Sequence, residues 1–214
     1  MDALIICGGR GTRLDTDAEK PLYEIAGKPM VDRVLAALRG SDVDEIHAAP
    51  SPHTPDTRAH LRGGCHVVET PGDGYVADLD CALEAVSTPV LTVTADLPLL
   101  APAVIDRVLA EAAPVDGTSP CGSLAVCVPA TLKRRLGASV DTAMGGLAPS
   151  GCNVVAETGT ERTYVSYDAR LAVNVNRGSD ADLAEALLVD TLSVETEARA
   201  DGIAGETRTG GDSA

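Results

Sequence analysis

The sequence predicts an α/β fold, with a Rossmann-like, mostly parallel sheet and flanking helices. Short apolar runs alternate with segments of helical spacing in the first half of the chain, and two runs, Ala3–Cys7 and Val90–Ala95, are almost entirely apolar. Continuous apolar runs are typical of strands that are buried on both faces. Because strand–helix–strand crossovers are right-handed and join parallel strands, the alternation favours a largely parallel sheet.

Strands and helices alternate regularly as far as Ala113. The expected strands are Ala3–Cys7, Glu45–Ala49, His66–Glu69 and Val90–Ala95. The expected helices are Met30–Leu38, Pro55–Leu61, Val76–Val86 and Pro102–Ala112. Proline suits the first turn of the second and fourth of these helices, where its missing N–H costs little.

The second half of the chain is less regular. The expected strands there are Leu124–Val128, Cys152–Ala156 and Thr163–Tyr167, and a closing helix is expected at Asp180–Val189 behind a Ser179 cap. The last residues are polar, rich in Gly, Thr and Asp, and without periodicity. We therefore expect one domain over residues 1–192 and a disordered tail over residues 193–214.

The composition is strongly acidic. There are 32 acidic and 17 basic residues, giving a net charge of −15, and only Lys20, Lys28 and Lys133 are lysines. The acidic residues are spread along the chain rather than gathered in blocks, which favours adaptation to high salt over an acidic surface for a basic partner. This charge sign disfavours nucleic-acid binding.

The cysteines and the apolar runs indicate a cytoplasmic protein. The six cysteines lack CxxC and Cys/His spacing, and most lie in apolar runs, as expected of free buried thiols in a reducing compartment. The N-terminus has no signal-peptide pattern, and no apolar stretch approaches the roughly 18 residues of a membrane span. The sequence leaves the oligomeric state open, and a homodimer is compatible with it.

A glycine-rich loop follows the first expected strand and predicts a triphosphate-binding site. It reads Gly8-Gly9-Arg10-Gly11-Thr12-Arg13-Leu14, and Lys20-Pro21-Leu22 follows after a short acidic segment. Glycines at a strand's carboxyl end let backbone N–H groups approach phosphate oxygens, while Arg13 and Lys20 add positive charge. The loop matches neither the Walker pattern nor the dinucleotide fingerprint, because it lacks their spacing.

Two further loops are expected at the same edge of the sheet. Ser51 follows the second strand, and Gly74 precedes the helix that carries Asp78. Hydroxyl and carboxylate groups there could read the edge of a guanine base. The alternatives are a turn with a Thr54 helix cap for the Ser51 segment and a solvated helix carboxylate for Asp78. The four histidines are interpreted as surface or packing residues.

Asp96 ends the apolar fourth strand and is the expected metal ligand. Mg²⁺ prefers oxygen ligands and is often held by one or two carboxylates together with substrate phosphates. Asn174 and Asn176 precede the last helix with the spacing that places both on one face. Both side chains could therefore point into the site, with turn formation as the alternative.

The loop GGxGTRL followed by KPL resembles the signature of the nucleoside-triphosphate transferase family. Downstream, the segments at Ser51–Thr57, Gly74–Leu79 and Ser150–Val155 resemble the archaeal adenosylcobinamide-phosphate guanylyltransferases, and the similarity spans most of residues 1–190. Cys7 departs from the small residue usual at its position, and the segment between Arg13 and Lys20 is short. The resemblance implies a fold of the nucleotide-diphospho-sugar transferase type, GTP as donor, a phosphorylated corrinoid as acceptor, and Mg²⁺.

The resemblance also implies roles for individual residues. Arg13, Lys20 and Asp96 would be catalytic, with Asp96 also holding the metal. The nucleotide would contact Gly8, Gly9, Arg10, Gly11, Thr12, Arg13, Lys20, Ser51, Gly74, Asp78 and Asp96. The acceptor would contact Gly151, Asn153, Asn174 and Asn176, although the segment around Gly151 could also be an ordinary loop. Two alternatives stay open: another acceptor, such as molybdopterin or phospholactate, and a nucleotide sensor without catalysis.

Overall fold

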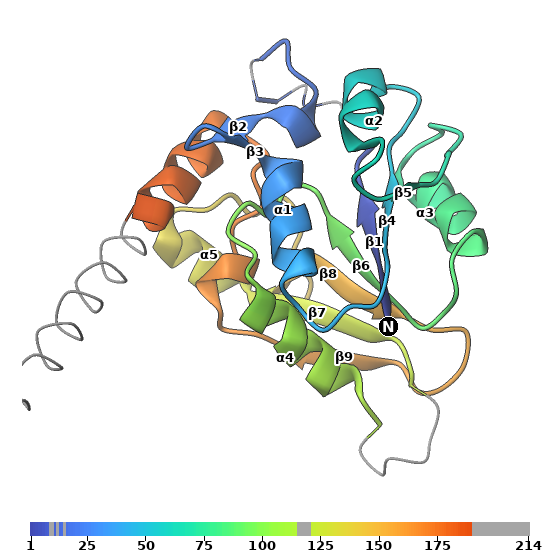
Figure 1. Ribbon diagram of the computed structural model, residues 1–214. Coiled ribbons are helices and arrows are strands. Elements are labelled where there is room, and N and C mark those ends of the chain that lie inside the picture. The colour runs from blue at the N-terminus through green and yellow to red at the C-terminus, as the bar shows by residue number, and fades with distance from the viewer. Residues whose placement is uncertain (9–10, 12, 15, 115–120, 190–214) are drawn as a thin grey trace, which may run out of the picture.

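The strands of the central sheet lie side by side in an order that differs from their order in the chain (Figure 1). In this computed structural model, which describes residues 1–8, 11, 13–14, 16–114 and 121–189, the order is β5 (His66–Val67), β4 (Ile46–Ala49), β1 (Asp2–Ile6), β6 (Val90–Thr94), β8 (Leu147–Val155), β7 (Leu124–Pro129) and β9 (Arg162–Val165). Among these strands only β8 is reversed, since it pairs antiparallel with both β6 and β7. The expected mostly parallel sheet is therefore confirmed.

The helices connect and cover these strands. They are α1 (Met30–Arg39), α2 (Pro55–Leu61), α3 (Tyr75–Glu84), α4 (Pro102–Ala112), α5 (Ala130–Leu136) and a last helix that covers residues 178–189. Two short 3-10 helices, η1 (Lys20–Leu22) and η2 (Ala169–Leu171), and a small hairpin of β2 (Glu24–Ile25) with β3 (Lys28–Pro29) complete the described elements.

Side-chain alternation along β1 explains the layers of the core. Ala3 and Ile5 pack in one buried cluster with the apolar faces of α1 and α4, whereas Leu4 and Ile6 pack in another with α3. Since successive strand residues point to opposite faces, a run that is apolar throughout serves both clusters. The core is built from aliphatic side chains, as the scarcity of aromatic residues requires.

The elements predicted from the sequence are largely confirmed. α2 and α4 have the predicted bounds, and most others differ by one or two residues at an end. The missed elements are α5, the β2–β3 hairpin, the two 3-10 helices and the first half of β8, which begins at Leu147 rather than Cys152. α5 has seven residues, too short to show a clear apolar period.

One predicted helix cap is wrong, and another has the predicted position without a capping side-chain hydrogen bond. The last helix already includes Ser179, and it is the Asp180 carboxylate that accepts hydrogen bonds from the backbone N–H groups of Asn176 and Arg177. Thr54 stands at the N-cap of α2, but its hydroxyl hydrogen-bonds to backbone carbonyls. Glu19 caps α2 instead, because its carboxylate accepts from the first free N–H groups of the helix.

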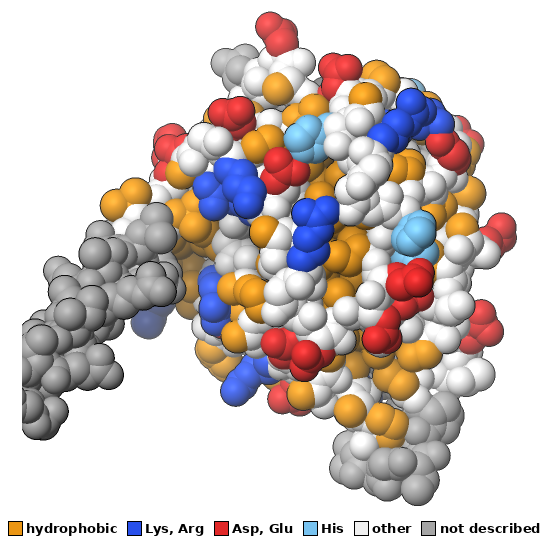
Figure 2. Space-filling model, in the orientation of Figure 1, with side chains coloured by type: hydrophobic (Ala, Val, Ile, Leu, Met, Phe, Trp, Pro, Cys, Tyr) orange, Lys and Arg blue, Asp and Glu red, His pale blue; other side chains and the backbone are white. Residues whose placement is uncertain are grey.

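Acidic side chains are distributed over the visible face rather than gathered in one block (Figure 2). The high-salt interpretation of the composition stays a prediction. In the described part of the chain, no helix has the length and apolar character needed to cross a membrane. The expected disordered tail, residues 193–214, lies outside the described residues, so that expectation and the one-domain boundary stay predictions.

We expect Leu91→Ala to lower the free energy of unfolding by about 2–5 kcal/mol, because Leu91 is fully buried in the central strand β6 and its removal leaves a cavity. Val76→Ala is the control, since Val76 is exposed on α3 and its truncation should change stability by less than about 0.5 kcal/mol. Urea denaturation in molar KCl measures both. Equal stabilities of the two variants would contradict this packing.

Candidate active site

The candidate site lies beside β1, at the point in the sheet where the order of the strands reverses its direction. From β1 the chain continues to β4 on one side, whereas β6 lies on the other side of β1. In open α/β sheets, ligands bind at the carboxyl ends of the strands at such a switch point. A cavity of about 480 Å³, here called the first cavity, lies at this edge and is lined by Ile6, Cys7, Gly8, Lys20, Pro21, Ser51, His53, Gly72, Asp73, Gly74, Tyr75, Asp78, Thr94, Ala95 and Asp96.

Close backbone packing fixes Lys20 at the first cavity. Gly11 has φ of +68°, and a Cβ there would lie 3.1 Å from Cβ of Lys20, so a larger residue would have to displace the lysine. Glu19, the residue before Lys20, is held by the N-terminus of α2. These two contacts explain why the ammonium group of Lys20 lies at the first cavity.

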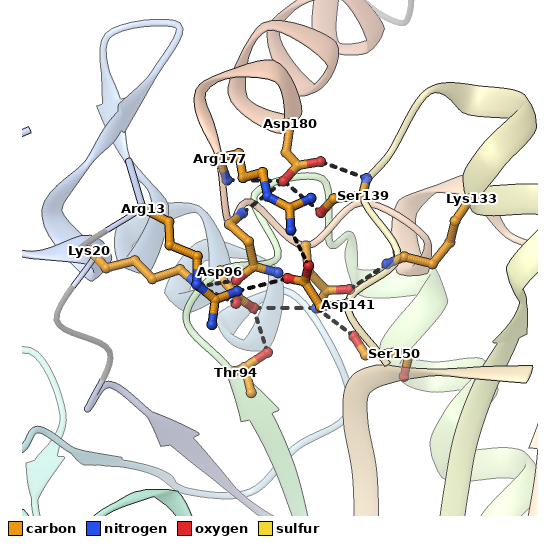
Figure 3. Close-up of polar contacts among 12 residues, drawn as sticks. Arg13, Lys20, Thr94, Asp96, Lys133, Ser139, Asp141, Ser150, Arg177 and Asp180 are labelled. Carbon is orange, nitrogen blue, oxygen red and sulfur yellow. Dashed lines mark hydrogen bonds and ion pairs between the residues drawn. The ribbon is translucent and has the colours of Figure 1, made fainter. Parts of the chain in front are cut away.

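Asp96 is the meeting point of several polar side chains (Figure 3). Its Oδ2 accepts a hydrogen bond from Lys20 Nζ at 2.6 Å, and its Oδ1 accepts from the Thr94 hydroxyl at 2.7 Å. Asn174 Nδ2 lies 3.4 Å from the same Oδ1, and Lys20 Nζ also donates to Asn176 Oδ1 at 2.7 Å. The predicted spacing of the two asparagines therefore does bring both side chains to Asp96.

A second cavity of about 290 Å³ adjoins the first. The two share Tyr75, Thr94 and Asp96 as a common wall. Burial, with a further contribution from Asp96, raises the pKa of Tyr75. The rest of the second cavity is lined by Lys133, Ser139, Asp141, Thr142, Ala148, Pro149, Gly151, Asn153, Asn174 and Asn176, which include every residue expected to bind the acceptor.

Lys133 was missed by the sequence reasoning because it lies on the short helix α5. Its residue is only 4% exposed, and its Nζ donates to Asn174 Oδ1 at 3.0 Å. Burial lowers the pKa of Lys133, while the negative charges of Asp180, Asp96 and Asp141 oppose that shift. A buried lysine beside two asparagines had no local signal in the sequence, although lysine is rare in this chain.

Asp180 and Asp141 were also missed, and both organise the second cavity. Asp180 is fully buried, and besides capping the last helix it accepts hydrogen bonds from the N–H and the hydroxyl of Ser139. Asp141 is paired with Arg13 at 3.0 Å and with Arg177 (Figure 3). Asp180 thus fixes the backbone of Asn176 from behind the cavity.

Two of the predicted nucleotide contacts in the first cavity, Ser51 and Asp78, are buried and hydrogen-bonded, whereas Gly74 is exposed. Ser51 is 2% exposed, and its Oγ accepts from the His53 N–H, so the turn alternative describes its local role. Asp78 is 5% exposed and accepts from the Gly72 N–H at 2.6 Å. The alternative of a solvated helix carboxylate is therefore wrong for Asp78.

Some predicted residues lie elsewhere or outside the described chain. Gly9, Arg10 and Thr12 are not among the described residues. Arg13 contacts Asp141, which lines the second cavity. Asn153 Oδ1 accepts from the Val126 N–H beside the register shift of β7 against β8, so that oxygen is engaged within the sheet.

The donor set around Asp96 suits a divalent cation. Asp96 Oδ2 and Asn176 Oδ1 both accept from one ammonium nitrogen, so a carboxylate and a carboxamide oxygen already converge on a single positive group. Oxygen donors are those that Mg²⁺ prefers. In the described chain, the one group of three potential ligands close enough to share an ion is Asp2, Glu45 and His47, at the opposite end of β1 and β4 from Asp96.

The buried cysteines of the sheet are poor candidates for covalent chemistry. Burial raises the pKa of the Cys152 thiol to about 12 and that of Cys7 further, so both are protonated near neutral pH. The thiolate is the nucleophilic form of cysteine. Although Cys7 lines the first cavity, it serves as a packing residue at the end of β1.

Comparison with known proteins shows the family. Residues 3–149 match the MobA-like NTP transferase domain. The chain belongs to this family. It is 34% identical over 196 residues to the adenosylcobinamide-phosphate guanylyltransferase of Methanocaldococcus jannaschii, with 88% of this chain and 97% of the relative covered. A match to the bifunctional protein GlmU of Rhizorhabdus wittichii, 33% identical, covers 53% of this chain and 27% of that protein. The chain is thus a nucleotidyltransferase, as the glycine-rich loop predicts.

Solved structures confirm the fold. A CMP:2-keto-3-deoxy-manno-octonic acid synthetase complexed with CTP is similar with a TM-score of 0.63 at 14% identity, covering 89% of this chain and 99% of that one. A nucleotidyl transferase from Methanothermobacter thermautotroptrophicus has a TM-score of 0.63 at 18% identity, covering 89% and 98%. At such identities the likeness concerns the fold alone, and it bears out the nucleotide-diphospho-sugar transferase type.

We expect Asp96→Asn to lower the rate of nucleotidyl transfer by about 10²–10³, because the neutral amide removes the charge at which both cavities meet. The variant should remain folded, since an amide of nearly the same shape fills the position. Asp80→Asn is the matched control, because Asp80 is exposed on α3. Turnover and melting temperature in molar KCl are compared. A folded Asp96→Asn protein with more than half the original turnover would contradict the role.

Gly151→Ala tests the close packing behind Asp96. A Cβ at Gly151 would lie 2.3 Å from Thr94 Oγ1 and 3.0 Å from Asn174 Nδ2, two groups that contact Asp96. We expect a loss of transfer rate of about tenfold or more, as small displacements of reacting groups cause. Gly63→Ala is the control, because Gly63 has nearly the same positive φ (+81° against +83°) but no atom near the added Cβ. Similar activities of the two variants would show that only backbone strain matters.

Proposed function

We propose that this chain transfers GMP from GTP to adenosylcobinamide phosphate, giving adenosylcobinamide-GDP and pyrophosphate. The observation that carries the proposal is the pair of adjoining cavities that share Asp96. A transferase with two substrates needs two binding sites that meet at one point. The relative from Methanocaldococcus jannaschii, matched along nearly its whole length, supports the choice of acceptor.

In the proposed reaction, an oxygen of the acceptor phosphate attacks the α-phosphorus of GTP. A new P–O bond joins the acceptor phosphate to GMP, the bond from the α-phosphorus to the β-phosphate oxygen breaks, and its electron pair leaves with pyrophosphate. The attacking oxygen is already anionic, so positioning and charge neutralisation supply most of the catalysis. Lys20 lies in the first cavity beside Asp96 and would bind the triphosphate.

The residues of the first cavity support guanine over adenine. Asp78 faces this cavity, with Gly8 beside its Oδ2, and it can accept hydrogen bonds from the N–H groups of a guanine edge. Guanine has two adjacent N–H donors that can both bond to one carboxylate, and adenine does not have this pair. Ser51 and Gly74 complete this wall, and the loop from Gly8 to Arg13 would surround the phosphates.

Mg²⁺ would be held by Asp96 with help from Asn176, since their oxygens already share one cationic partner. When bound, it supplies charge neutralisation on the phosphate oxygens. Lys20 would then turn toward the triphosphate. Arg13 would leave its contact with Asp141 and also turn toward the triphosphate. Each of these two cations has a carboxylate partner in the structure and would exchange it for phosphate.

The proposed setting is the cytoplasm of a halophilic archaeon. The dispersed acidic charge supports a high-salt interior, where charges are screened within about 3 Å at molar salt. The six cysteines are free in the structure, which supports a reducing compartment, although only Cys7 and Cys152 are buried and the other four are partly exposed.

We expect the purified protein in molar KCl with Mg²⁺ to release pyrophosphate from GTP only when adenosylcobinamide phosphate is present. ATP should support little release, and chelation of the metal should stop it. Pyrophosphate and adenosylcobinamide-GDP are measured together, because they form in equal amounts. Transfer to molybdopterin or phospholactate instead would show that the proposed acceptor is wrong. GTP binding without transfer to any of the three acceptors would favour a nucleotide sensor.

A further inference from the structure

Two of the three lysines in this chain converge on Asp96. Figure 3 shows Lys20 and Lys133 reaching the centre of the site from opposite sides. Lys20 lines the first cavity and Lys133 the second. The third lysine, Lys28, is exposed in the β2–β3 hairpin. In a protein with so few lysines, this convergence needs a cause beyond surface charge.

The two lysines have matching partners. Lys20 Nζ donates to Asn176 Oδ1 at 2.7 Å, and Lys133 Nζ donates to Asn174 Oδ1 at 3.0 Å. They differ in one respect, because Lys20 also pairs directly with Asp96, whereas the described partner of Lys133 is the neutral amide alone. Each cavity therefore has its own ammonium group, with the carboxylate of Asp96 between them.

Lys133 is a buried charge with unused hydrogen-bonding capacity. An ammonium group can donate three hydrogen bonds, and within the described residues it makes one. Burying a charge without full pairing costs free energy. Because Lys133 lines the second cavity, a ligand there can supply the missing acceptors.

We propose that Lys133 binds the phosphate of the acceptor, a phosphate monoester, and positions it for attack. This rests on the proposed function, which assigns the second cavity to the acceptor. A phosphate provides several anionic oxygens, which suit the free donors of the ammonium group. With the two lysines in separate cavities, Lys20 would bind the triphosphate of GTP and Lys133 the phosphate of the acceptor. These are the two anions that must approach one another.

A purely structural role for Lys133, holding Asn174 in place, is the alternative that the test must separate. A pair of ligands makes the separation: adenosylcobinamide phosphate and adenosylcobinamide, which lacks the phosphate. Loss of a contact to phosphate weakens only the first ligand. Loss of the cavity's shape weakens both ligands.

The experiment measures binding of both ligands by calorimetry in molar KCl, with a non-hydrolysable GTP analogue and Mg²⁺ present. Lys133→Met should weaken binding of the phosphorylated ligand by about 10- to 100-fold and leave the other ligand and the GTP analogue unchanged. Lys133→Arg should restore part of the loss. Lys28→Met is the control and should behave like the original protein.

Equal weakening of both ligands, or no weakening of either, would overturn the proposal. If the original protein binds neither corrinoid, the proposed acceptor fails, and inorganic phosphate then tests Lys133 separately. With the GTP analogue occupying the first cavity, saturable phosphate binding that Lys133→Met removes would uphold the lysine's role. Phosphate binding that survives the substitution, or no phosphate binding at all, would overturn it.

Discussion

The site depends on one carboxylate that is surrounded by hydrogen-bond donors from distant parts of the chain. Asp96 receives the ammonium group of Lys20, the hydroxyl of Thr94 and the amide of Asn174. Its own backbone carbonyl accepts from the Val175 N–H, which ties the segment before the last helix to the end of β6. Because charge-assisted hydrogen bonds are the stronger ones, this cluster holds the walls of the first and second cavities in a fixed relation.

The sheet explains why the carboxylate lies there. The parallel strands β1 and β6 end at the same edge, so Gly8 after β1 and Asp96 after β6 line one cavity. The reversed strand β8 passes this edge in its middle, at Gly151, where the absence of a side chain lets the backbone approach Thr94. The fold thus brings three segments to one point, and Gly151 is the local adjustment that lets β8 approach.

The features that repeat locally could be predicted from the sequence. Apolar runs, helical spacing and the glycine-rich loop gave the sheet, most helices and the edge at which Gly8, Lys20 and Asp96 meet. The spacing of Asn174 and Asn176 gave their common orientation. Each of these signals lies within a short window of the chain, where backbone geometry alone fixes which side chains share a face.

The residues that were missed depend on partners far away in the chain. Lys133 contacts Asn174, Asp180 contacts Ser139, and Glu19 caps a helix that begins at Pro55. Nothing near these residues marks them, because a lysine on a short helix or an acid in a polar segment is ordinarily a surface residue. The error at α2 has the same origin, since the distant Glu19 performs the task assigned to Thr54. At the last helix the cap is Asp180, the residue next to the predicted Ser179.

The course of β8 has a consequence for how such proteins can diverge. The match to the family ends at residue 149, just before the glycine at which β8 meets Thr94, while all four residues first expected to contact the acceptor lie beyond it. The matched part contains the first cavity, Asp96 and most of the second cavity's lining, including Lys133, and the segment beyond it adds Gly151, Asn153, Asn174 and Asn176. If the second cavity holds the acceptor as proposed, substitutions in the segment beyond the match could change the molecule that is modified without touching the first cavity.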